Sequence, residues 1–61
     1  MWKVFNFVFR SSDYLEQRQQ DMVKWLNYVE EEGWEPRKID FWGRNSFADH
    51  DGVSIYARKK D

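Results

Sequence analysis

Leu26-Asn27-Tyr28-Val29-Glu30-Glu31-Glu32-Gly33-Trp34-Glu35 predicts a helix end, a chain reversal and the start of a strand, and these three features determine the architecture. Leu26 and Val29 supply an apolar helical face. Gly33 can adopt the left-handed conformation that closes a helix, and Trp34 stands where a hydrophobic residue folds back over the last turn. The stretch carries no chemistry, so it indicates architecture rather than activity.

The length and composition of the chain allow one small domain, residues 1–61. A core of this size rarely contributes more than about 3–5 kcal/mol of net stability, so we expect the aromatic residues, 20% of the chain, to supply much of the packing. Without cysteine there is no disulfide and no thiolate metal site. A net charge of −1 argues against nonspecific phosphate binding, and no apolar run is long enough for a signal peptide or a membrane span. We therefore expect a soluble cytoplasmic protein without a cofactor.

Residues 1–9 alternate between two faces, which predicts a strand. Phe5, Phe7 and Phe9 share one face, and the other face is formed by Trp2, Val4, Asn6 and Val8. Both faces are largely apolar, which is typical of a strand that is covered on both sides.

A helix is predicted next, opened by Asp13 with Glu16 as a capping pair, or by Ser12 as the alternative cap. Its apolar stripe consists of Leu15, Met22, Leu26 and Val29, with Val23 and Trp25 at the edges. Arg18, Gln19 and Gln20 interrupt this stripe, so we expect the first turns to extend past the sheet or to fray. The glutamates at positions 30–32 are expected to be solvated and partly offset by Arg37 and Lys38.

Two further strands follow the helix. In the first, Ile39 and Phe41 alternate with Lys38, Asp40 and Trp42, and Pro36 predicts an edge position because proline cannot donate to a ladder. Residues 43–52 are rich in turn formers and predict a long hairpin loop. In the last strand, Val53, Ile55 and Ala57 alternate with Ser54, Tyr56 and Arg58.

This order predicts an α+β fold, a single strand-helix-strand-strand domain. A right-handed crossover through the helix makes the first two strands parallel, and the hairpin can place the last strand between them. The sheet order is then 1-3-2, with the helix on one face. The predicted core comprises Phe5, Phe7, Phe9, Met22, Leu26, Val29, Ile39, Phe41, Val53, Ile55 and Ala57.

Three segments together carry a resemblance to a known family. They are Trp2-Lys3-Val4, the Leu-Asn-x-x-x-x-Glu-Gly-Trp-Glu run at positions 26–35, and the final strand that ends in basic residues at positions 55–59. The chain resembles the small bacterial and phage family catalogued as domain of unknown function 4177. The resemblance covers most of the chain and implies the same strand-helix-strand-strand fold, with no established activity or catalytic residues. The chain departs from the family pattern at Pro36-Arg37-Lys38, where apolar strand residues usually continue.

Asp49-His50-Asp51 is the cluster that looks most like a catalytic or metal site, because a carboxylate beside histidine can orient the imidazole. However, these are ordinary turn residues next to Gly52, and consecutive residues rarely converge on one metal. We therefore interpret the cluster as a turn and expect neither a metal nor an enzyme.

Aromatic and basic residues interleave in the strands and their flanks, which would suit stacking on single-stranded nucleic acid. The residues concerned are Trp2, Lys3, Trp42, Arg44, Tyr56, Arg58 and Lys59, with Arg44, Arg58 and Lys59 as the expected phosphate contacts. Acidic residues outnumber basic ones, so this function is the alternative rather than the main hypothesis.

The main hypothesis is a noncatalytic module that binds another protein or forms a homodimer. If the helix covers the Phe5 face, the opposite face gathers apolar side chains that favour an interface. The predicted interface residues are Trp2, Val4, Val8, Trp42 and Tyr56. A competing interpretation is that Trp2 and Tyr56 only shield each other.

Overall fold

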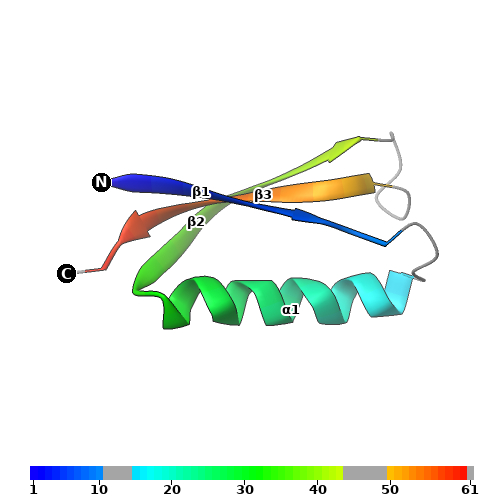
Figure 1. Cartoon of the computed structure of the whole chain (residues 1–61), viewed down its shortest axis with the longest axis horizontal. Helices are drawn as coiled ribbons and strands as arrows, with labels where there is room; N and C mark the ends of the chain where they lie inside the picture. The colour runs from blue at the N-terminus through cyan, green and yellow to red at the C-terminus, as the bar shows by residue number, and fades with distance from the viewer. Residues whose placement is uncertain (11–14, 44–49, 61) are drawn as a thin grey trace.

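The computed structural model describes residues 1–10, 15–43 and 50–60. In this part of the chain, strand β1 spans Trp2–Val8, helix α1 spans Leu15–Glu31, strand β2 spans Trp34–Gly43 and strand β3 spans His50–Lys59. The sheet order is β1-β3-β2, and β3 is antiparallel to both neighbours, so β1 and β2 run parallel. Figure 1 shows α1 along one side of the twisted sheet, with no other described element on the opposite side. The predicted α+β fold, sheet order and single covered face are confirmed.

The core lies between α1 and the sheet. Its buried hydrophobic members are Phe5, Phe9, Val29, Trp34, Val53, Ile55 and Ala57. Aromatic contacts join the helix to β1, the closest being the Trp25 ring stacked on Phe7 with centroids 4.8 Å apart. The predicted core is confirmed except at Ile39 of β2, which is 40% exposed. The ring contacts described for α1 are made to β1 and its extension, and they leave Ile39 uncovered. The remaining predicted members are buried or partly buried, and Trp34 joins them.

The first half of α1 faces the core through an arginine. Arg18 is buried, its guanidinium carbon lies 4.6 Å from the centre of the Phe9 ring, and Nη2 reaches the Arg10 carbonyl at 3.5 Å. The aliphatic stem of arginine can cover apolar surface while its planar head stacks on a ring. Arg18 therefore extends the buried side of the helix N-terminal to Met22, where the sequence predicted an interruption, whereas Leu15 of the predicted stripe is 42% exposed.

The end of α1 is closed by Gly33, as predicted, with φ at +89°. The Gly33 amide donates to the Glu30 carbonyl at 3.0 Å, and the Glu32 amide donates to the Tyr28 carbonyl at 3.1 Å. The reversal places the Trp34 ring edge-on to the Phe5 ring, with the two ring centroids 6.3 Å apart. The helix terminus and the start of β2 are therefore parts of one aromatic cluster.

Strand β2 is longer and less regular than the sequence indicated. It begins at Trp34, two residues before Pro36, and its register with β3 shifts between Pro36 and Lys38 and again between Trp42 and Gly43. The edge position predicted from Pro36 is confirmed. The ion pairs of Arg37 and Lys38 in the described chain are made within β2 itself, to Glu35 and Asp40, and not to the glutamates at the end of α1.

Strand β3 begins at His50 rather than at Val53, so the loop predicted over residues 43–52 is longer than the structure allows. Backbone pairing explains the difference, because Gly43 pairs with His50 and the Phe9 amide donates to the Asp51 carbonyl at 2.9 Å. The predicted helix caps, Ser12 and Asp13, lie outside the described residues.

Gly33→Val is expected to lower the free energy of unfolding by more than about 1 kcal/mol, because a β-branched residue resists positive φ. A Cβ at this position would make an ordinary van der Waals contact, with Lys59 Nζ nearest at 3.7 Å, so the cost is backbone strain rather than a clash. Gly33→Asn, which tolerates this conformation better, should cost clearly less. Urea unfolding followed by circular dichroism measures both variants, and equal stability of Gly33→Val and the wild type would contradict this helix end.

Candidate interaction surface

The side of the sheet opposite α1 is called the helix-free face. Its residues alternate along each strand with those of the core, and the register aligns them in four rows across β1, β3 and β2. The rows are Trp2-Arg58-Glu35, Val4-Tyr56-Lys38, Asn6-Ser54-Asp40 and Val8-Gly52-Trp42. Chain segments distant in sequence thus form one continuous surface.

The five predicted interface residues all lie on the helix-free face. Val8 is 69% exposed and Trp2 is 61% exposed, while Val4 and Trp42 are exposed to a smaller extent and Tyr56 is partly buried. Single exposed hydrophobic residues are normal, but several on one face mark a surface suited to binding. Trp2 and Tyr56 occupy adjacent rows and different strands, so mutual shielding would leave Val8 and Trp42 uncovered.

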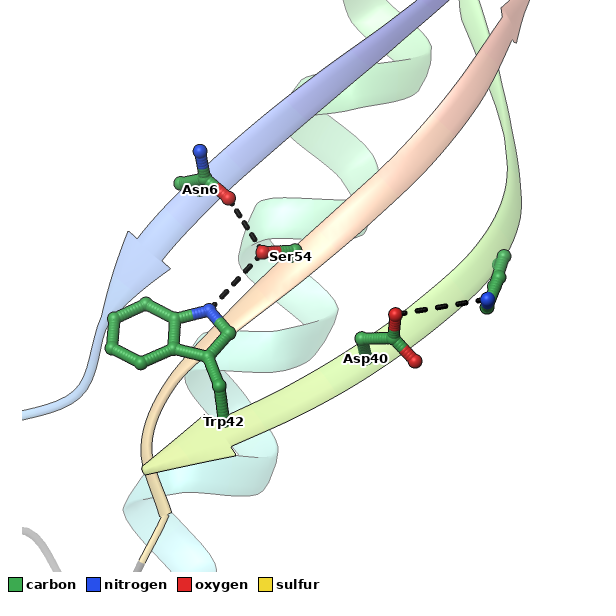
Figure 2. A network of polar contacts seen from close by, with 5 residues as sticks. Asn6, Asp40, Trp42 and Ser54 are labelled. Atoms are coloured by element: carbon green, nitrogen blue, oxygen red, sulfur yellow. Dashed lines mark hydrogen bonds and ion pairs between the residues drawn. The ribbon is translucent and has the colours of Figure 1, made fainter. Parts of the chain in front are cut away.

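A hydrogen-bond network crosses all three strands on the helix-free face (Figure 2). The Trp42 indole Nε1 donates to Ser54 Oγ at 3.1 Å, and the Ser54 hydroxyl donates to Asn6 Oδ1 at 2.5 Å. Sequence reasoning missed this network, because the registers that align the three residues come from two separate strand pairings. The network fixes the direction of the Trp42 ring across the sheet.

Gly52 lies beneath the Trp42 ring. A Cβ at Gly52 would overlap that ring and crowd the backbone carbonyl of Phe7, so only glycine leaves room for this arrangement. The indole therefore lies over Gly52 of β3 and holds its hydrogen bond to Ser54.

Charged residues flank the apolar part of the helix-free face along β2. Lys38 Nζ lies 3.7 Å from Asp40 Oδ2 and 5.6 Å from the centre of the Tyr56 ring. Arg37 Nη1 lies 3.3 Å from Glu35 Oε1. These pairs are about half exposed or more, so each contributes little to stability and remains available to a partner.

Basic residues gather at the end of the sheet where β3 finishes. A shallow pocket there is lined by Glu35, Arg37, Arg58, Lys59 and Lys60. Of the residues proposed to contact nucleic acid, Arg58 and Lys59 lie at this pocket, and Arg44 lies outside the described residues. Lys59 Nζ also lies 5.0 Å from the centre of the Trp34 ring, toward the helix side.

The Asp49-His50-Asp51 cluster is only partly described. His50 is the first residue of β3 and Asp51 is an exposed strand residue, while Asp49 and the His50 side chain lie outside the described set. The interpretation of the whole cluster as a turn is therefore wrong for His50 and Asp51. The described residues hold no group of three or more His, Asp or Glu side chains that could share a metal ion.

No family model, curated protein or solved structure matches this chain. The β-α-β-β topology implied by the family resemblance is present. Within residues 1–10, 15–43 and 50–60, no helix combines the length and the apolar character needed to cross a membrane.

Gly52→Ala is expected to displace the Trp42 ring and to lower the free energy of unfolding by about 1–3 kcal/mol, because the added methyl group overpacks a filled site. The indole N–H of Trp42 should then lose its bond to Ser54 and exchange faster with solvent. Chemical denaturation and the indole resonance in ¹⁵N-correlated NMR spectra measure the two effects. Unchanged stability together with an unchanged Trp42 indole resonance would refute this packing.

Proposed function

We propose that the protein is a small noncatalytic interaction module that binds a protein partner through the helix-free face. The observation that carries the proposal is the gathering of Trp2, Val4, Val8, Trp42 and Tyr56 on one uncovered side of the sheet. Tryptophan and tyrosine are common anchors of interfaces, because each buries a large area with few rotatable bonds.

The rigidity of the surface supports the same proposal. Trp42 is held by Ser54 and lies over Gly52, and Ser54 is in turn bonded to Asn6. A side chain that is already ordered loses little conformational entropy when a partner covers it. A sheet surface with an oriented indole therefore offers binding energy at low ordering cost.

On the family resemblance, we infer an origin among small bacterial or phage proteins. On this proposal the chain is an accessory or regulatory protein that acts in the cytoplasm by occupying a surface of another protein. It needs no cofactor, and Asp51 and His50 serve as strand residues rather than as catalytic groups.

Val8→Glu is expected to abolish partner capture while leaving the fold intact, because it places a charge in the most exposed apolar part of the helix-free face. Val23→Glu is the matched control, since Val23 is 59% exposed on α1 and undergoes the same chemical change. Immobilised wild type and both variants are exposed to lysate, and the bound proteins are identified by mass spectrometry. Capture that survives Val8→Glu and fails in Val23→Glu would contradict the proposal.

Binding of single-stranded nucleic acid is the second candidate, favoured by the basic pocket that includes Arg58, Lys59 and Lys60. Counterion release makes such binding fall steeply with salt. Fluorescence anisotropy with a labelled oligonucleotide separates the candidates. Submicromolar, salt-sensitive binding that weakens in Arg58→Glu but not in Lys24→Glu, an exposed charge reversal on α1, would favour nucleic acid over protein as the ligand.

A further inference from the structure

We propose that the partner covering the helix-free face is a second copy of this chain, related by a two-fold axis that lies parallel to the sheet and perpendicular to its strands. The inference rests on the proposed use of this face for binding. Two sheets packed face to face lie about 10 Å apart and keep their strands roughly aligned. The self-complementarity of the four rows argues for this arrangement.

This axis lays each strand on its own equivalent and reverses the order of the rows. The Trp2-Arg58-Glu35 row then faces the Val8-Gly52-Trp42 row of the second copy, and the two central rows face each other. Trp2 therefore meets Val8 of the second copy, which joins the two most exposed apolar side chains of β1.

The charges of the central rows match under the same rotation. Lys38 faces Asp40 of the second copy, and by symmetry Asp40 faces Lys38 of the second copy. Because Lys38 already pairs with its own Asp40 at 3.7 Å, two copies create a cluster of four alternating charges. Arg58 faces Gly52 of the second copy, which is covered by the Trp42 ring, so a cation–π contact becomes available.

The other in-plane two-fold axis, parallel to the strands, fits less well. It would lay β1 of one copy on β2 of the other, placing Val4 against Lys38 and Trp2 against Glu35. Burying a charge against an apolar side chain is unfavourable. The first axis makes one such contact, between Glu35 and Trp42, in an outer row rather than at the centre. The arrangement of charges thus favours the first axis.

A second copy also suits the charge balance of the surface. On the helix-free face and its β2 edge, Lys38, Arg58 and Arg37 stand beside Glu35 and Asp40, which leaves one excess positive charge. The whole chain carries a net charge of −1. Neither the helix-free face nor the whole chain carries the large net charge that would attract a strongly charged foreign partner. Three strands of seven, ten and ten residues, about 4.8 Å apart and about 3.3 Å per residue, cover less than the roughly 800 Å² per partner of a standard interface. We therefore expect a dissociation constant on the order of tens to hundreds of micromolar.

The test uses two charge variants, alone and mixed, in sedimentation equilibrium up to about millimolar protein, a range that spans the weak association expected of a small interface. Lys38→Glu puts a second carboxylate against Asp40 of the second copy, and Asp40→Lys puts two ammonium groups together. Each variant alone should dimerise about tenfold more weakly than the wild type. An equimolar mixture should recover dimers, because every facing pair is then opposite in charge while the pair within each chain stays broken.

Lys24→Glu and Glu31→Lys are the matched controls, because both positions are exposed on α1 and the changes shift the net charge in the same directions. Each control should dimerise like the wild type. Two results would overturn the proposed axis. One is that Lys38→Glu and Asp40→Lys each dimerise like the wild type. The other is that their mixture has an average molar mass no higher than that of either variant alone. A strictly monomeric wild type whose Val8→Glu variant still loses partner capture would overturn the second copy and leave the binding function standing.

Discussion

The structure depends on one constraint: a single helix covers one face of a three-stranded sheet whose first strand is apolar on both faces. The helix side of β1 is packed by aromatic contacts to α1, as the stacking of Trp25 on Phe7 shows. The other side presents Trp2, Val4 and Val8 to solvent. Helix and sheet form two layers, and no element within residues 1–10, 15–43 and 50–60 covers the second apolar surface. The proposed function and the proposed second copy both follow from this incomplete layering.

The helix end stabilises the covered side of the sheet. The reversal at Gly33 places Trp34 in the core, and the ammonium groups of Lys3 and Lys59 lie 5.6 and 5.0 Å from the centre of its ring. Lys3 comes from β1 and Lys59 from β3, so one indole joins the three strands near the end of α1. On the opposite side, the Trp42 network joins the same three strands. A chain without disulfides thus uses one tryptophan on each face of the sheet to connect its strands.

The features that could be predicted from the sequence are local ones. Strict alternation over residues 1–9 and the glycine after a helical segment predicted β1 and the end of α1, and the sheet order followed from chain connectivity.

Arg18 was missed because a charged residue is normally assigned to solvent, whereas its stem and planar head pack on Phe9. The start of β3 was missed because Asp51 and Gly52 resemble turn residues, and backbone pairing with neighbouring segments overrides that preference. The facial placement of the interface residues followed from alternation, but the contacts among Trp42, Ser54 and Asn6 depend on registers that no single segment encodes.

The four tryptophans provide the most direct test of the central claim, that binding occurs on the side of the sheet that α1 leaves uncovered. Trp2 and Trp42 lie on the helix-free face, whereas Trp25 and Trp34 contact the core on the helix side. The measurement is the change in the four indole N–H resonances as the protein concentration is raised into the millimolar range. Association through the helix-free face shifts the resonances of Trp2 and Trp42 and leaves those of Trp25 and Trp34 constant. Shifts confined to Trp25 and Trp34 would contradict it.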